Sequence, residues 1–420
     1  MTTTNGTTSP STGTGTGTAQ KRTDPGAVEG DFYAVKDLLD PEERQILDRV
    51  RAFLDAEVRP LANEQWADAT TPVHLAAGLA DLGITGSAYH GYGCPGFSNL
   101  LAGLLTMEMG RVDASFATFF GVHSGLALGS VMLTGSDEQR RRWLPDLLAW
   151  RRIGAFALTE PDVGSGAAGG LTTTARREGD TWILDGRKKW IGNGTFADLI
   201  VVWARDVADG QVKGFVVDKS NHGDDRVPGF TATKIEGKVS LRGVQNALIE
   251  LDGVRVPEAD RLQNAHTFKD VARVLKTTRG GVAWNALGCS IGAYEAARRY
   301  AVEREQFGRP IARFQIVQDN LARMLANITA SQGLLVRMAQ LQDEHRLSDP
   351  QASVAKMFCT TAARETVQLA REVFGGNGIL VDHDIARFWA DAEALYSYEG
   401  TRDMQALIVG RAATGHSAFV

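Results

Sequence analysis

The sequence has few residues of the kinds that build disulfide frameworks or metal sites. Its three cysteines, Cys94, Cys289 and Cys359, lie far apart and form no CxxC pair, which excludes a disulfide scaffold and is typical of a reducing compartment. The eight histidines show no HExxH or clustered spacing. The segment VDHDIARF at 381–388 has polar residues typical of a solvated helix start, so we predict no metal site.

Strong net charge and long apolar runs are also absent. The formal net charge of −5 gives no overall attraction to nucleic acid, which argues against that class of partner. No apolar run approaches the roughly 18–20 residues of a bilayer span, so no membrane insertion is predicted. The Thr/Gly/Ser-rich residues 1–30 lack the apolar region of a signal peptide, and we expect a disordered tail. The terminal SAFV is no peroxisomal address, which leaves the cytoplasm as the expected location.

At 420 residues the chain is long enough for a large core and two or three compact units. Apolar residues at helical spacing follow Asp40, an expected N-cap with Pro41 at the first helical position and Glu43 completing a capping box. Between about 155 and 260, short β-branched and aromatic stretches predict antiparallel strands in a small barrel or sandwich. Further helices are expected at 97–112, 118–133, 137–149, 276–305, 311–344 and 350–374, the last three forming an antiparallel bundle.

The order of these segments predicts an α+β protein. We expect a helical N-terminal domain (31–154), a middle β-domain (155–265) and a C-terminal domain (266–420) resembling a four-helix bundle. No βαβ alternation is present, which disfavours a doubly wound sheet. A helical repeat scaffold is excluded by the β-domain and by the lack of any period of roughly 30–45 residues.

Five short motifs carry residues suited to a planar or phosphate-bearing ligand. The loop LTEPDVGSGAAGG (158–170) exposes backbone N–H groups, and KKWIGNGTFADL (188–199) ends a strand in a Trp before a two-glycine turn. EREQFGRPI (303–311) and FGGNGIL (374–380) close long helices, and YEGT (398–401) precedes the last helix. Each motif has an ordinary structural explanation, but chance does not readily place all five in this order across an α-β-α chain.

These motifs, together with GYGCPG, RVDASFATF and KVSLRGVQN, resemble the acyl-CoA dehydrogenase family over essentially residues 31–420. In order and wording the chain is most similar to the glutaryl-CoA dehydrogenase branch, which also contains short-chain acyl-CoA oxidases. The resemblance implies non-covalent FAD between the β-domain and the C-terminal helices, an acyl-CoA substrate, and a homotetramer in which one site uses two chains. The electron acceptor would be electron-transferring flavoprotein, or O2 in an oxidase.

The resemblance also implies which residues bind FAD. Phe156, Leu158 and Thr159 would lie against the flavin ring, Trp190 would cover it, and Ser165 would reach the pyrophosphate. Thr401 and Asp403 would touch the adenosine or pyrophosphate portion. A neighbouring subunit would supply Arg304, Phe307, Gln315, Gly375 and Gly376, and further FAD-binding positions are Gly164, Ile191, Gly192 and Glu372.

By the same resemblance, Glu399 would be the catalytic base that removes the α-proton of the thioester while hydride leaves the β-carbon for flavin N5. A base for so weak an acid needs a raised pKa, which desolvation against an aromatic wall and the flavin would provide. Gly400 would let a backbone N–H stabilise the enolate, and Tyr398 would pack near the acyl chain and exclude water. Arg279 matches a family position that would support the base or the acyl carbonyl.

Three positions depart from the family pattern. Glutaryl-CoA dehydrogenases pair the distal carboxylate of the substrate with an Arg where this chain has Ala117, followed by Thr118. We therefore predict a neutral monocarboxylic acyl chain, with these two residues and Ser165 among its contacts. Gly192 replaces a Thr that can bond flavin N5 and leaves room there, as in oxidase relatives, so oxidase activity with O2 stays an alternative. Gly166 replaces an Asp, a local change in the loop.

Two other functions fit the same motifs. A glutaryl-CoA dehydrogenase is disfavoured because Ala117 would leave the substrate carboxylate buried and unpaired. A catalytically silent flavin-binding protein is disfavoured by the retained Glu399. The length of the acyl chain is not readable from these residues.

Overall fold

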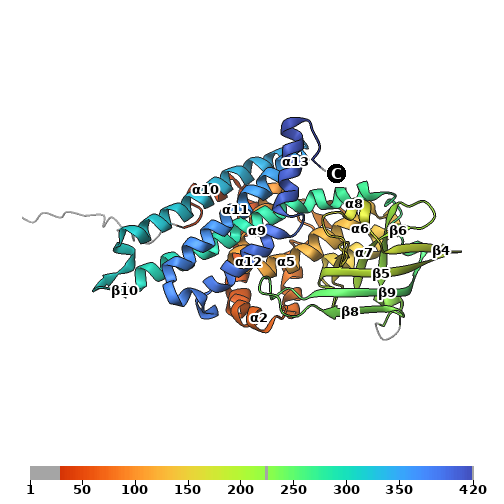
Figure 1. Cartoon of the computed structure of the whole chain (residues 1–420), viewed down its shortest axis with the longest axis horizontal. Helices are drawn as coiled ribbons and strands as arrows, with labels where there is room; N and C mark the ends of the chain where they lie inside the picture. The colour runs from red at the N-terminus through yellow and green to blue at the C-terminus, as the bar shows by residue number, and fades with distance from the viewer. Residues whose placement is uncertain (1–28, 223–225, 419–420) are drawn as a thin grey trace, which may run out of the picture.

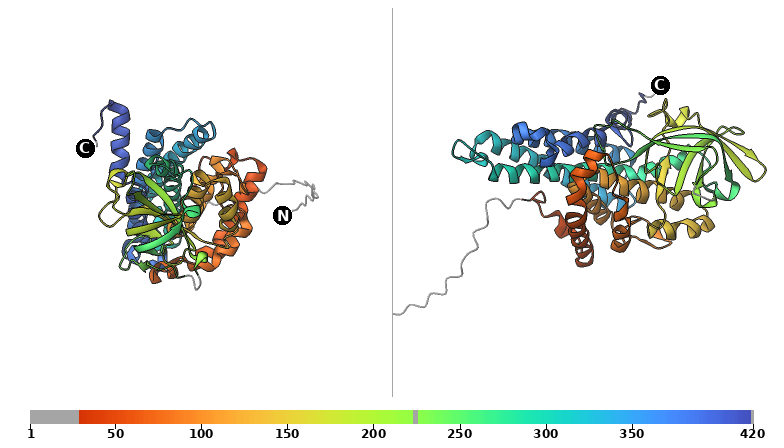
Figure 2. Two further views of the ribbon diagram at one scale, coloured as in Figure 1. Left: turned by 90° about the vertical axis from the view of Figure 1, so that its right-hand side faces the viewer. Right: turned by 90° about the horizontal axis from the view of Figure 1, so that it is seen from below.

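The computed structural model of the chain describes residues 29–222 and 226–418. In the described sequence, helical segments precede and follow the strands of a seven-stranded sheet, which lies at one end of the molecule (Figure 1), and this confirms the predicted α+β fold. The long C-terminal helices extend away from the sheet, and the N-terminal helices pack beside these long helices, as Figure 2 shows. The expected disordered tail falls mostly on residues 1–28, outside the described part of the chain.

The N-terminal helices begin where polar residues can cap them. Asp40 caps α1 (Pro41–Phe53), its carboxylate accepting the Glu43 N–H at 2.8 Å, as predicted. The second half of the expected capping box is wrong, because the Glu43 carboxylate instead accepts the Ser98 N–H at 3.2 Å. The helices that follow are α2 (Ala62–Asp68), α3 (Ala76–Leu82), α4 (Asn99–Val112), α5 (Ala114–Gly121), α6 (Leu128–Thr134) and α7 (Asp137–Leu148), with the hairpin β1 (His90–Gly91) and β2 (Cys94–Pro95) before α4.

Helix α5, the π-helical turn Val122–Ala127 and α6 form one continuous helix, Ala114–Thr134, of 21 residues. It contains no Asp, Glu, Lys or Arg, so the prediction that no apolar run approaches bilayer length is wrong for this stretch. Most of the helix is buried inside the protein, where it packs against β3 (Gly154–Ala157) and α9 (Phe268–Glu303). Its apolar character is therefore that of a core helix.

The middle sheet is mixed rather than purely antiparallel. Its order is β3-β6-β4-β5-β9-β8, with β7 paired to β6. Most pairs are antiparallel, as predicted, but β3 and β4 each run parallel to β6. Along β9 buried and exposed side chains alternate, so one face of the sheet forms a core. Besides β3 and the short helix α8 (Ala167–Gly170), the elements are β4 (Thr174–Glu178), β5 (Thr181–Gly192), β6 (Leu199–Asp206), β7 (Val212–Asp218), β8 (Phe230–Lys234) and β9 (Asn246–Pro257).

Helix α9 is the centre of the C-terminal part and packs against α4 on one side and α11 on another. At the crossing with α4, a Cβ at Gly288 would lie 2.1 Å from the Met107 carbonyl oxygen, so only glycine fits. This close crossing fixes two walls of the cavity that contains the candidate active site. The other helices are α10 (Gln315–Asp343), α11 (Asp349–Phe374), α12 (Ile385–Ser397) and α13 (Arg402–Thr414), and the hairpin β10 (Glu305–Gln306) and β11 (Arg309–Pro310) joins α9 to α10.

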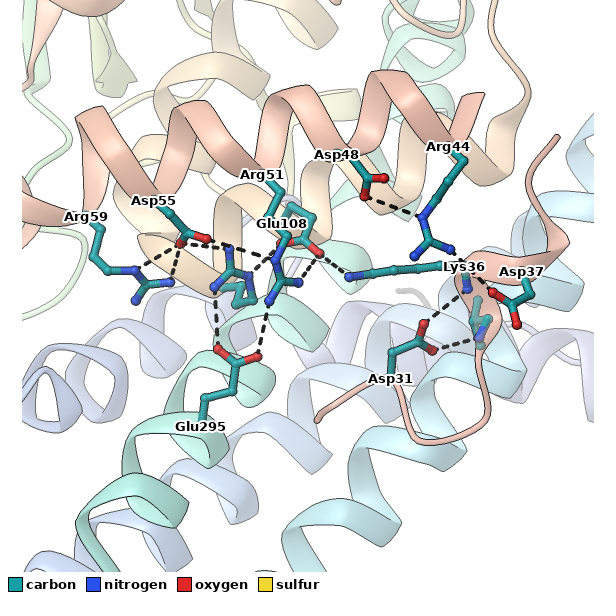
Figure 3. Close-up of polar contacts among 12 residues, drawn as sticks. Asp31, Lys36, Asp37, Arg44, Asp48, Arg51, Asp55, Arg59, Glu108 and Glu295 are labelled. Carbon is teal, nitrogen blue, oxygen red and sulfur yellow. Dashed lines mark hydrogen bonds and ion pairs between the residues drawn. The ribbon is translucent and has the colours of Figure 1, made fainter. Parts of the chain in front are cut away.

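A network of charges joins the N-terminal helices to α9 (Figure 3). Glu108 of α4 is fully buried, and its carboxylate pairs with Lys36 at 2.8 Å, Arg51 at 3.0 Å and Arg111 at 2.6 Å. Arg111 reaches on to Glu295 of α9 at 3.4 Å. Burial would raise the pKa of Glu108, but the three cations outweigh it and hold the pKa at about 2. The ionised form of Glu108 therefore stabilises the folded chain at neutral pH.

Replacement of this carboxylate, Glu108→Gln, should lower the free energy of unfolding by about 3 kcal/mol at pH 7, because three cations then surround a neutral group. The folded pKa lies below the ordinary 4.5, so the contribution is present above that pH and is lost as pH falls toward 2. Urea unfolding followed by circular dichroism over this pH range measures both effects.

The matched control is Glu365→Gln, which removes an exposed pair with Arg323 and should cost less than about 1 kcal/mol. If Glu108→Gln costs no more than this control, the charge network does not stabilise the folded chain. The same conclusion follows if the loss in free energy of unfolding caused by Glu108→Gln is as large at acid pH as at pH 7.

Candidate active site

A cavity of about 230 Å³ lies where the N-terminal helices, α9 and the segment between α12 and α13 meet. Its walls are mostly small or uncharged side chains from α4, the Ala114–Thr134 helix and α9. Among the described residues that line it, Glu399 alone is charged, and no Lys, Arg or His lines it. A carboxylate in such surroundings is a candidate catalytic group.

Glu399 belongs to a tight turn, Tyr398–Gly400, which we call the Glu399 turn. Two successive residues have left-handed backbone conformations, with φ of 54° at Glu399 and 84° at Gly400. Such a φ costs a non-glycine residue roughly 1–2 kcal/mol, so it persists only with support from neighbouring groups. The turn leads into Thr401, whose side chain accepts the Met404 N–H at 3.2 Å and caps α13.

Lys356 of α11 holds the Glu399 turn through its backbone. The Nζ of this lysine donates to the carbonyl oxygens of Tyr398 and Gly400, the residues on either side of Glu399. The side chain is completely buried. Sequence reasoning missed Lys356, although a lysine within the apolar face of a helix is a readable signal. The buried residues on that face of α11 include Ala352, Ala355, Cys359 and Ala363.

Two further polar side chains, also missed, contact the turn. Gln405 of α13 donates from Nε2 to the Gly400 carbonyl oxygen at 3.1 Å, and a Cβ at Gly400 would lie 2.6 Å from that nitrogen. Thr278 of α9 donates from its hydroxyl to Glu399 Oε2 at 3.3 Å. The turn and its carboxylate are thus held from α9, α11 and α13.

Burial is the largest influence on the Glu399 carboxyl group, and it raises the pKa. The charge of Lys356, the hydroxyl of Thr278 and the charge of Arg279 oppose this rise. Burial also lowers the pKa of Lys356 to about 8, against the attraction of Glu399. The Nε and Nη1 groups of Arg279 are buried and have no hydrogen-bond partner within the described chain. A raised pKa makes Glu399 a stronger base than a free glutamate.

Uncharged polar groups meet at the cavity wall beside this carboxylate. The Tyr398 hydroxyl lies 3.4 Å from Thr118 Oγ1 and 3.5 Å from Asn285 Nδ2. Burial raises the pKa of Tyr398 to about 12, so the phenol is neutral at ordinary pH. Ala117 and Thr118, two of the predicted substrate contacts, both line the cavity, whereas Ser165 lies exposed in a loop and is not among the lining residues.

Comparison with known proteins identifies the family. Three family models match the chain: the acyl-CoA dehydrogenase N-terminal domain over residues 40–151, the middle domain over 155–254 and the C-terminal domain over 268–414. The chain belongs to the acyl-CoA dehydrogenase family. The family predicted from the sequence motifs is thereby confirmed.

Similar proteins cover nearly the whole chain. The 3-(aryl)acrylate reductase of Clostridium sporogenes is 32% identical over 374 residues, which are 88% of this chain and 97% of that protein. Two structures of glutaryl-CoA dehydrogenase from Mycobacterium smegmatis superpose with a TM-score of 0.88. One is 38% identical and covers 93% of this chain and 100% of its own. The other, in complex with FADH2, is 35% identical and covers 92% and 98%.

The residues predicted to contact the flavin ring lie in two adjoining segments. Phe156 and Leu158 are buried in and just after β3. The Thr159 carbonyl accepts the Lys189 N–H at 2.8 Å, which places Thr159 beside the end of β5. Trp190 is 51% exposed and its backbone φ is 66°. Its indole is therefore accessible from solvent rather than part of the core. A half-exposed indole at this place fits a planar cofactor.

The neighbouring glycine positions differ in how much space surrounds them. Gly164 and Ser165 are exposed, and a Cβ at Gly164 would meet nothing within 4 Å, so a phosphate could approach the backbone. Ile191 and Gly192 are buried at the end of β5. A Cβ at Gly192 would lie 3.0 Å from Val122 Cγ2, so the space at this glycine is narrow. Val122 also lines the cavity, which links β5 to the Glu399 site.

The residues predicted to come from a neighbouring subunit lie at the far end of the molecule. Figures 1 and 2 place the β10–β11 hairpin at the opposite end of the long helices from the sheet. Phe307, between these strands, is 91% exposed, and Phe374 at the end of α11 stacks on Tyr300 of α9 at 4.2 Å. Thr401 and Asp403 lie instead at the start of α13, next to the Glu399 turn. The other predicted FAD-binding residues at this end are also exposed: Arg304, Gln315, Glu372, Gly375 and Gly376.

A methyl group at the second position of the Glu399 turn should destabilise the chain. Gly400→Ala places an L-residue at φ 84° and against Gln405 Nε2, so the free energy of unfolding should fall by about 1–2 kcal/mol. The control Gly410→Ala lies within α13, where a Cβ meets nothing within 4 Å, and should stabilise by up to about 1 kcal/mol. Urea unfolding compares the two, and equal effects would contradict the strain assigned to Gly400.

Proposed function

We propose that this acyl-CoA dehydrogenase uses FAD to form a double bond between the α- and β-carbons of an acyl-CoA, with Glu399 as the base. The observation that carries the proposal is the place of Glu399, the one carboxylate on a left-handed turn in a cavity whose other described lining groups are uncharged. FAD, when bound, accepts the hydride that leaves the β-carbon. Family membership and the FADH2 in a similar glutaryl-CoA dehydrogenase support this cofactor.

The residues of the Glu399 turn divide the remaining work. The Glu399 carboxylate takes the α-proton, and the electron pair of the α-C–H bond becomes the new double bond as hydride leaves the β-carbon. Thr278 occupies Oε2, so we assign the proton to Oε1. The Gly400 N–H is the group we assign to the thioester oxygen, where negative charge develops. We assign Tyr398, which is hydrogen-bonded to Thr118, to the exclusion of water from this part of the cavity.

Arg279 is the second cation we place at the site. It opposes the rise in the pKa of Glu399, and its Nε and Nη1 groups have no hydrogen-bond partner in the described structure. A buried N–H group without a hydrogen-bond acceptor lowers the stability of the fold unless a ligand supplies the acceptor. We therefore assign Arg279 to support of the base or of the acyl carbonyl.

The acyl chain that fits this cavity is neutral. No cation lines it among the described residues, and Ala117 and Thr118 form its wall where an arginine would be needed for a second carboxylate. An unpaired carboxylate buried there would cost several kcal/mol. These observations favour a monocarboxylic substrate over glutaryl-CoA, although two similar structures are glutaryl-CoA dehydrogenases.

Electron-transferring flavoprotein is the acceptor we propose, and O2 is the alternative. The narrow space between Gly192 and Val122 supports a site that shields its reduced cofactor from small molecules. The glycine itself, which oxidase relatives share, favours the alternative. Release of hydrogen peroxide when air is admitted to the reduced enzyme would identify an oxidase.

We also propose a homotetramer, because the β10–β11 hairpin, which carries one set of predicted FAD-binding residues, lies at the end of the long helices away from the sheet, which carries another set. Exposed apolar side chains at the far end would be covered by a neighbouring chain. They include Phe307, Ile316, Ile379 and Leu380. The cytoplasm stays the predicted location.

Replacement of the base should stop the chemistry while leaving the fold intact. Glu399→Gln should slow the anaerobic bleaching of FAD by acyl-CoA by roughly 10²–10⁴-fold or more, because general-base catalysis is lost. FAD content and acyl-CoA binding should be retained, since the amide keeps the shape of the side chain. Glu393→Gln, on the exposed side of α12, is the matched control and should bleach at the normal rate. Normal bleaching by Glu399→Gln would exclude Glu399 as the base.

The neutral lining also predicts discrimination between two substrates of the same chain length. Pentanoyl-CoA should bleach the bound FAD at least about 100-fold more efficiently than glutaryl-CoA, since the second carboxylate finds no cation. Single-turnover reduction rates over a range of substrate concentrations measure this ratio. If glutaryl-CoA is the better substrate, the dicarboxylic alternative holds instead.

A further inference from the structure

The Glu399 turn is unusual in what holds it. Two successive left-handed residues leave the carbonyl groups of Tyr398 and Gly400 outside any helix, since the turn falls between the last residue of α12 and the start of α13. Buried carbonyl groups need donors. Both carbonyls receive a hydrogen bond from the same atom, Lys356 Nζ, so one ammonium group bridges the residues on either side of Glu399.

The ammonium group of Lys356 has no carboxylate in contact with it. The lysine is 0% exposed, and no ion pair is formed with any residue in the described part of the chain. By contrast, Lys188, which is equally buried, lies 2.9 Å from the Glu160 carboxylate. A buried cation without a contacting anion is costly. The acid that acts on Lys356 is Glu399 itself, which opposes the effect of burial on the lysine.

The groups around Glu399 come from three elements. Lys356 acts from α11, Arg279 and the Thr278 hydroxyl act from α9, and Tyr398 precedes Glu399 in the turn. The phenol of Tyr398 is neutral at ordinary pH. Of the two cations, Lys356 also fixes the backbone. Its loss would therefore change both the position of the carboxylate and its charge environment.

We propose that Lys356 is a positioning residue of this active site. Its ammonium group bridges the carbonyls of Tyr398 and Gly400, holds Glu399 in the left-handed conformation that directs its side chain into the cavity, and supplies positive charge that keeps the carboxylate ionised. This inference rests on the proposed function of Glu399 as the base. Lys356 itself does not line the cavity, so it acts through the turn rather than on the substrate.

The first measurement does not depend on turnover. Infrared difference spectra of the FAD-loaded enzyme against Glu399→Gln isolate the carboxylic acid band of Glu399, and titration of that band gives its pKa. In Lys356→Met, which keeps an unbranched side chain only one atom shorter but removes charge and donors, the Glu399 titration should move to higher pH by about one unit or more. Lys356→Arg keeps the charge and should titrate close to the unsubstituted protein.

The second measurement is the pH profile of anaerobic FAD reduction by pentanoyl-CoA. The base must be ionised to react, so the rate falls on the acid side, and a higher pKa moves this limb upward in pH. Lys356→Met should reduce FAD about 100-fold more slowly, with its acid limb shifted, because a displaced carboxylate loses its alignment. The substrate concentration at half-maximal rate should change little, since the cavity wall is intact. Lys356→Arg should restore the position of the limb.

The matched control is Lys238→Met. Lys238 is another largely buried lysine whose Nζ donates to two backbone carbonyls, those of Leu241 at 2.7 Å and Val244 at 2.5 Å. It makes no contact with the Glu399 turn, so its loss should lower stability without moving the Glu399 titration. If Lys356→Met does not fold, Lys356→Gln keeps one donor without charge, and the same shift is expected.

Two results would overturn the inference. One is a Glu399 titration that stays in place in Lys356→Met or Lys356→Gln, and the other is an equal shift in Lys238→Met, which would show a general effect of destabilisation. Failure of every acyl-CoA to bleach the unsubstituted enzyme would count against the proposed function alone, since the infrared titration still decides the role of Lys356.

Discussion

The site depends on keeping one carboxylate in a cavity that does not solvate it well. Desolvation would strengthen Glu399 in its proposed role as the base, but the same desolvation favours the protonated acid, which cannot act as a base. The structure balances these effects with a hydroxyl from Thr278 and positive charge from Lys356 and Arg279, all held on long helices. The strength of the base is therefore set by the packing of α9 and α11, at some distance in sequence from the turn that carries it.

Three lysines of this molecule donate hydrogen bonds to backbone carbonyls. Lys188 donates to the Leu158 carbonyl at 3.0 Å, Lys238 bridges the carbonyls of 241 and 244, and Lys356 bridges those of the Glu399 turn. All three donate to segments outside the helices and strands. An ammonium group with three donors can satisfy more than one carbonyl at once.

The sequence was most informative where the controlling contacts are local. The Asp40 cap, the long helices and the Glu399 motif depend on residues within a few positions of one another. The order of the motifs was enough to predict the family. The contacts that were missed join distant positions. Lys356 meets a turn more than forty residues later, and the parallel pairing of β3 with β6 spans a similar separation. The helix predicted at 118–133 was confirmed as part of Ala114–Thr134, but its near-bilayer length was missed, and its apolar residues face protein on several sides rather than forming one stripe.

The proposed base and two of the predicted substrate contacts lie on different elements of this protein. Glu399 and its supports lie on α9, α11 and the turn before α13, whereas Ala117 and Thr118 lie on α5. Under the proposed function, an alanine in place of an arginine on α5 would change the charge of the substrate that fits. Close crossings such as Gly288 on Met107 keep the helices in place during such exchanges. This chain therefore superposes closely on glutaryl-CoA dehydrogenases although the described residues that line its cavity include no Lys, Arg or His.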